Sequence, residues 1–157
     1  VAAALAKADP PHAEAYAARG EAYAKKLLDL DAWAKAEFGK IPAAQRKVIT
    51  SHEAFGYLGA AYGVELMAPM GLSTEDEAAA ADVAALIDQI KAEGIKTVFL
   101  ENSTDPRLVT EIAKATGAKV GGTLYPESLT AEGGPASTYL KMFRYNVSTL
   151  VAGMRGE

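Results

Sequence analysis

The sequence predicts an α/β fold, in which a four-stranded parallel sheet is flanked by helices and preceded by one long helix. Short runs rich in β-branched residues alternate with helical patterns of about 10 to 20 residues from residue 40 onward, as in parallel sheets. Glycines follow the helical patterns and are typical helix stops. The 157 residues, half of them hydrophobic, suffice for one domain with a substantial core.

The amino-terminal part is expected to be helical throughout. Residues 1–8 have the pattern of the last two turns of a helix, which suggests that the sequence is part of a longer protein. Asp9 and the two following prolines are expected to cap and restart the helix. An apolar stripe then runs from Ala13 to Phe38, and Gly39 ends it. At 1.5 Å per residue this helix would be roughly 39 Å long, and we interpret residues 1–39 as a strut between two bodies.

Residues 40–157 are expected to form the α/β lobe. Four strands are predicted at Lys47–Thr50, Val64–Met67, Thr97–Leu100 and Lys119–Thr123. Four helices are predicted at Glu53–Tyr62, from the capping-box pattern of Ser73–Glu77 to Glu93, from Asp105-Pro106 to Gly117, and at Ser137–Gly153.

Composition excludes several classes of protein. A net charge of −4 argues against a nucleic-acid partner, which requires a basic surface. No apolar run approaches the ~20 residues that span a bilayer, and residues 1–7 lack the basic start of a signal peptide. The absence of cysteine excludes disulfides and thiolate metal sites.

The candidate metal ligands are His52 and Asp105. Each follows an expected strand, and the carboxyl ends of parallel strands lie at one sheet edge, where ligands bind. Imidazole and carboxylate suit Zn or Mn. A purely structural role is also consistent with each residue: Asp105 as a helix cap before Pro106, and His52 as a polar turn residue.

Three other ionisable residues are given structural roles. We expect Glu53 to be a first-turn acid that complements the helix dipole. Glu101 is expected to pair with a backbone N–H or with Arg107, and His12 to be an ordinary surface residue.

Several dispersed segments resemble the C-terminal lobe of the solute-binding proteins of metal-uptake ABC transporters, the zinc and manganese family also called cluster A-I. The resemblance covers almost the whole chain. It rests on residues 8–31, on Ser51–Leu58 with Tyr62-Gly63, on Glu101–Arg107, and on Tyr139–Leu150.

In that family four side chains hold one metal ion between two lobes, and the resemblance implies that His52 is the third ligand and Asp105 the fourth. The first two, both histidines, would belong to an N-terminal lobe that is absent from this chain, so the chain alone should bind metal weakly. Zn is the expected ion, with Mn or Fe as alternatives. The implied partners are an ABC permease and the N-terminal lobe, and the implied location is periplasmic or extracytoplasmic, with or without a lipid anchor.

Two other classes of function are consistent with the residues. A small metal-dependent or triad hydrolase on a flavodoxin-like sheet would need a general base, which Glu101 or Glu127 could supply. A triad of Ser103, His52 and Asp105 lacks the G-x-S-x-G elbow. An interaction domain would use the long helix for pairing, and exposed apolar surface there is expected to favour self-association under either interpretation.

Overall fold

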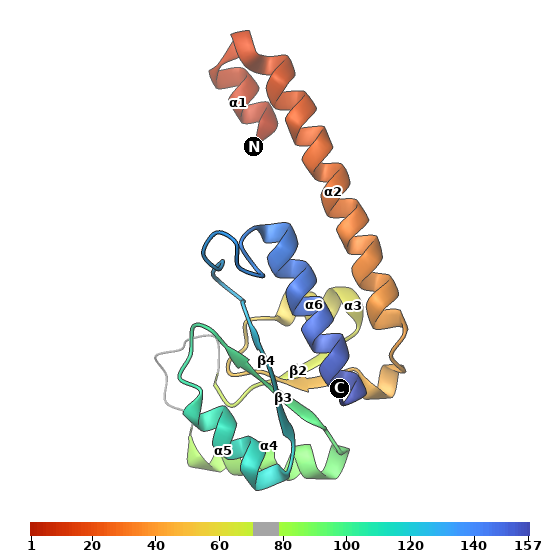
Figure 1. The fold of residues 1–157 in the computed structure, drawn as a ribbon, viewed down its shortest axis with the longest axis vertical. Coiled ribbons are helices and arrows are strands. Elements are labelled where there is room, and N and C mark those ends of the chain that lie inside the picture. The colour runs from red at the N-terminus through yellow and green to blue at the C-terminus, as the bar shows by residue number, and fades with distance from the viewer. Residues whose placement is uncertain (71–78) are drawn as a thin grey trace. The chain divides into compact units, whose positions relative to one another are not determined.

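The computed structural model describes residues 1–70 and 79–157 and divides the chain into two compact units, Val1–Lys35 and Ala36–Glu157. The predicted four-stranded parallel sheet with flanking helices and a long preceding helix is confirmed (Figure 1). The expected capping boxes between Ser73 and Glu77 lie outside the described residues.

The first unit is helical. Helix α1 (Ala2–Ala8) is followed by a 3-10 turn, Pro10–His12, and by α2 (Ala13–Gly39), whose last residues belong to the second unit. Asp9 makes no helix cap. Its carboxylate instead accepts a hydrogen bond from the Tyr16 hydroxyl at 2.8 Å and pairs with the exposed His12 ring. Since a β-carbon on Gly20 would lie 2.8 Å from that of Ala2, glycine allows α1 to approach α2 closely.

The sheet of the second unit has the strand order β2-β1-β3-β4, with every pair parallel. The chain moves from β1 outward to β2, crosses back over β1 to β3, and continues outward to β4. The direction of winding therefore reverses between β1 and β3. The strands are β1 (Lys47–Ile49), β2 (Glu65–Met67), β3 (Thr97–Glu101) and β4 (Lys119–Leu124).

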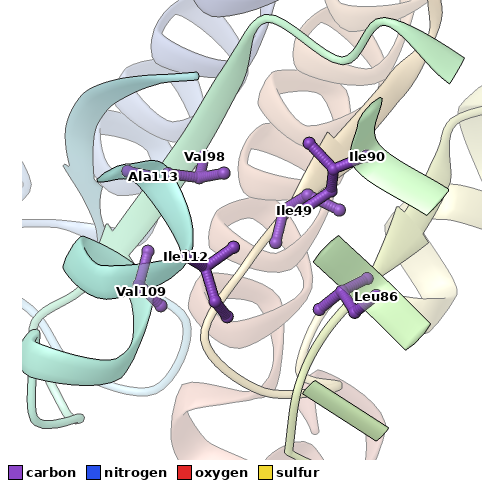
Figure 2. Packing of buried hydrophobic residues seen from close by; sticks show 7 residues of the cluster. All are labelled: Ile49, Leu86, Ile90, Val98, Val109, Ile112 and Ala113. Carbon is purple, nitrogen blue, oxygen red and sulfur yellow. The ribbon is translucent and has the colours of Figure 1, made fainter. Parts of the chain in front are cut away.

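Helices cover both faces of the sheet. On one face, α4 (Ala80–Glu93) and α5 (Arg107–Thr116) pack on β1 and β3 (Figure 2). The buried side chains of this cluster are Ile49, Leu86, Ile90, Val98, Val109, Ile112 and Ala113. On the other face, α6 (Tyr139–Arg155) contacts β1, β3 and β4. Phe99 of β3 points to this side, where Gly121 and Gly153 leave room for its ring.

Three helix ends follow the expected glycine stops, whereas α6 continues past its expected end at Gly153 to Arg155. Gly63, Gly94 and Gly117 adopt the left-handed conformation after α3 (Gly56–Tyr62), α4 and α5. The predicted start of α3 at Glu53 is wrong, because residues 51–55 form a turn and the helix begins at Gly56. Glu53 therefore precedes the first helical turn and does not complement its dipole.

In the part of the chain that the structure covers, no helix has both the length and the apolar composition needed to cross a bilayer.

Candidate metal centre

The candidate site lies where the winding direction of the sheet reverses. At such a point the loops that leave two neighbouring strands run to opposite sides and open a crevice at the carboxyl edge. Here the neighbours are β1 and β3, and the loop after β1 carries His52 while β3 ends with Glu101. His52 also forms an isolated parallel bridge with Met70, which follows β2.

Glu101 holds the turn that carries His52. Its Oε1 accepts hydrogen bonds from the backbone N–H of Ser51 at 2.9 Å and of His52 at 3.3 Å. Its Oε2 contacts Nδ1 of the His52 ring. Both residues are buried, with 3% of Glu101 and 1% of His52 exposed. The expected pairing of Glu101 with backbone N–H groups is confirmed, whereas Arg107 pairs elsewhere.

The alternation of side chains along β3 explains why a carboxylate is buried here. Thr97 donates a hydrogen bond to the carbonyl of Gly153 on α6, and Phe99 also packs there. Glu101 is in the same register and points into the same layer. Burial raises the pKa of the Glu101 carboxyl above its ordinary value, while the His52 ring and the two N–H groups act in the opposite direction.

The second ring nitrogen of His52 faces another carboxylate. Nε2 lies 3.3 Å from Oε1 of Glu127, whose side chain is 60% exposed and comes from the loop after β4. Asn146 on α6 anchors this loop by accepting from the N–H of Tyr125 at 2.9 Å and donating to its carbonyl at 2.8 Å. A surface depression opens at this point; it is lined by His52, Glu53, Ala54, Gly56, Tyr57, Ala60 and Glu127.

Asp105 lies at the same edge of the sheet but makes different contacts. Its Oδ1 accepts from the N–H of Arg107 at 2.9 Å, and its Oδ2 accepts from Nε of Arg107 at 2.8 Å. These two hydrogen bonds hold Asp105 against the first residue of α5. The helix begins at Arg107, one residue later than expected. The Arg107 guanidinium, with the Arg107 N–H, lowers the pKa of the Asp105 carboxyl. Within the described residues, no hydrogen bond or ion pair joins Asp105 to His52.

His52 therefore lies between two carboxylates of different kinds. A metal-binding histidine characteristically uses one nitrogen for the ion and the other for a hydrogen bond that orients the ring. Buried Glu101 has the geometry of the orienting partner, while Nε2 and the exposed Glu127 face the depression. Among residues 1–70 and 79–157, no three side chains form a group that could hold a metal ion by itself.

The residues of the considered hydrolase triad are not assembled. Both ring nitrogens of His52 contact glutamates, and Asp105 pairs with Arg107. Neither Ser103 nor Asp105 is therefore placed as a triad with this histidine requires.

Glu127 is the neighbour of His52 that the sequence analysis did not propose as a metal ligand, although it considered Glu127 as a general base. Its position after the fourth strand of a parallel sheet was the available signal, since all such loops meet at one edge.

The fold and the site together define an α/β lobe with a ligand crevice at its carboxyl edge. A family model described as ZnuA, zinc-uptake complex component A, periplasmic, matches residues 1–153. The chain belongs to this family, which confirms the resemblance seen in the sequence.

Named relatives bind different metals. The chain is 37% identical over 150 residues to the iron-binding protein YfeA of Yersinia pestis, with 96% of this chain and 48% of the relative covered. It is 32% identical over 156 residues to the manganese-binding lipoprotein MntA of Bacillus subtilis, covering 96% and 51%. The solved structure of the periplasmic zinc-binding protein TroA from Treponema pallidum matches with a TM-score of 0.92 at 30% identity, covering 98% of this chain and 57% of that one. The chain thus spans about half the length of the curated relatives it matches.

Proposed function

We propose that this chain is the C-terminal lobe of an extracytoplasmic receptor that binds a transition-metal ion and delivers it to an ABC permease, without enzymatic activity. The observation that carries the proposal is the buried His52, which has one ring nitrogen against buried Glu101 and the other toward Glu127 at the winding reversal of the sheet. The similarity to proteins named as iron-, manganese- and zinc-binding supports it.

In this proposal residues 1–39 are the interlobe segment and residues 40–157 the lobe that contributes the third and fourth ligands. A preceding lobe of the longer protein would contribute the other two, in keeping with the half-length match to relatives. A site of about four donors is needed for tight zinc binding. The separation of donors between two lobes would make metal binding depend on both.

His52 Nε2 is the proposed nitrogen donor of this lobe. Two carboxylates compete for the next position: Asp105, which the resemblance implies, and Glu127, which the contacts favour. Glu127 faces Nε2 directly, whereas the carboxylate oxygens of Asp105 already accept two hydrogen bonds from Arg107. We therefore propose Glu127 ahead of Asp105.

The donor set favours zinc as the cargo and also admits manganese or iron. Imidazole nitrogen suits the borderline ions, while a carboxylate also accommodates the harder ones. Competition titrations of the full-length protein with the three ions would rank them.

Three single variants of the full-length protein test the assignment. His52→Ala is expected to weaken zinc binding roughly ten- to a thousandfold, because one of about four donors is lost. Glu127→Gln should weaken binding by at least about tenfold, whereas Asp105→Asn should leave affinity within about threefold, since its amide still accepts the Arg107 N–H. Isothermal titration measures all three.

The outcomes separate the competing assignments. If Asp105→Asn weakened zinc binding more than Glu127→Gln did, Asp105 rather than Glu127 would be the ligand. Normal zinc affinity of His52→Ala would refute the site itself.

A further inference from the structure

Glu101, the last residue of β3, and Asn102, which follows it, contact the loops that leave the two neighbouring strands. In the strand order, β3 lies between β1 and β4, so its last residues can reach both neighbours. Glu101 contacts the turn after β1. Asn102 donates from Nδ2 to the Ser128 hydroxyl at 2.5 Å, and its backbone N–H donates to the carbonyl of Leu124 at 3.1 Å. Ser128 is adjacent to Glu127.

We infer that Glu101 and Asn102 are positioning residues for the metal centre: Glu101 sets the ring orientation and tautomer of His52, and Asn102 holds the loop that carries Glu127. This inference rests on the proposed function. In it, the dipeptide Glu101-Asn102 binds no metal itself but positions both donors, His52 and Glu127.

The tautomer follows from how the oxygens of Glu101 are used. Oε1 already accepts two backbone N–H groups, and Oε2 faces Nδ1 of His52. A carboxylate can only accept hydrogen bonds, so Nδ1 must carry the ring proton. Nε2 is then the nitrogen that faces the depression and Glu127, and a metal ion bound there would replace any proton on it.

Replacement of Glu101 by glutamine should move the ring proton of His52 from Nδ1 to Nε2, while the shape of the side chain at position 101 is conserved. In Glu101→Gln the two backbone N–H groups still require an acceptor, so the amide oxygen takes the position of Oε1. The amide NH2 then faces Nδ1 and donates to it, and the ring proton moves to Nε2. The variant therefore keeps the turn but blocks the coordinating nitrogen.

The hydrogen bond from Asn102 to Ser128 holds the loop that carries Glu127, the second proposed donor. Asn102→Ala and Ser128→Ala each remove this hydrogen bond and leave the backbone bond to Leu124 in place. If both act through the same contact, the double variant should lose no more zinc affinity than either single variant, an expected loss of about three- to tenfold. Additive losses would overturn the role of Asn102.

Nitrogen NMR of the histidine rings in the metal-free chain tests the role of Glu101. The chain holds two histidines, so exposed His12 provides an internal reference. The parent chain should show a proton on Nδ1 of His52, and Glu101→Gln should show an unprotonated Nδ1 with the proton on Nε2. Glu132→Gln, an exposed loop change, should match the parent. An unprotonated Nδ1 in the parent, or the same state of Nδ1 in the parent and in Glu101→Gln, would overturn the inference.

Zinc titration of the full-length Glu101→Gln protein separates this inference from the proposed function. With the tautomer inverted, affinity should fall about 10- to 100-fold. An inverted tautomer with unchanged affinity would show that His52 does not bind the metal, and would reject the proposed function while the tautomer assignment stands. Circular dichroism of both chains checks that the fold is kept.

Discussion

At the scale of single residues, the carboxylates of the site differ in how many hydrogen bonds and ion pairs each already makes. Glu101 is buried and receives three nitrogen contacts from one turn. Glu127 is exposed and faces one ring nitrogen. Asp105 is exposed and paired with Arg107. A carboxylate with free oxygens is the better candidate for an incoming cation, because no existing bond must be broken first.

The pairing of Asp105 predicts a measurable titration. The Arg107 side chain and N–H hold the pKa of Asp105 below its ordinary value of 3.8. Because the folded-state pKa is lowered, the stabilising contribution is present above that ordinary value and is lost as pH falls through the folded pKa. Arg107→Gln should raise the Asp105 pKa toward its ordinary value, as measured by carbon NMR of the carboxyl.

A matched control is available on the same helix. Lys114 pairs with Glu111 rather than with Asp105. Lys114→Gln should therefore leave the Asp105 titration unchanged. An unshifted Asp105 pKa in Arg107→Gln would mean that the guanidinium is not its main partner.

At the scale of elements, the packing of β3 against β4 and α6 depends on glycines. A β-carbon on Gly121 would lie 2.7 Å from Cε1 of Phe99 and 2.8 Å from Cγ2 of Thr97. Phe99 is fully buried, so its ring is enclosed by neighbouring side chains. Close packing thus explains why small residues occur where the aromatic ring inserts.

Gly121→Ala is expected to lower the free energy of unfolding by about 1–3 kcal/mol, because overpacking forces the buried ring to shift. Urea denaturation measures this change. Gly39→Ala is the control, since a β-carbon there meets nothing within 4 Å and alanine is favoured over glycine in helices by up to about 1 kcal/mol. A Gly121→Ala protein as stable as the parent would contradict this account of the packing.

Elements also show where sequence reasoning succeeded. β-branched runs predicted all four strands, and the glycines after α3, α4 and α5 predicted three helix ends. These signals are local: a β-branched side chain favours a strand, and a left-handed stop favours glycine. The start of α3 was missed because Glu101, about fifty residues away in sequence, binds the N–H groups of Ser51 and His52.

At the scale of the whole molecule, the main fact is that the chain covers about half of its relatives. In the described part of the chain, no three side chains are grouped so that they could hold a metal ion together. His52 with one carboxylate gives two donors, and chelation by a larger preformed set is what makes metal binding strong.

The isolated chain is therefore expected to bind zinc weakly, with a dissociation constant in the micromolar range or above, as measured by isothermal titration. Light scattering at the same concentration should accompany the titration, because self-association of the chain could complete the site from two copies. Sub-micromolar binding with a 1:1 stoichiometry by a monomer would contradict the proposed division of ligands.

Patterns in the sequence determined the secondary structure, the parallel sheet, the family and the choice of His52 as a candidate ligand. Propensity and periodicity act over a few residues, and the family motifs, although dispersed along the chain, can be read without the fold. Only the tertiary structure decided which carboxylates meet that histidine. Glu101 and Glu127 lie 49 and 75 positions from His52, and their approach depends on strand order and side-chain register. Those arise from the packing of the whole sheet rather than from any single segment.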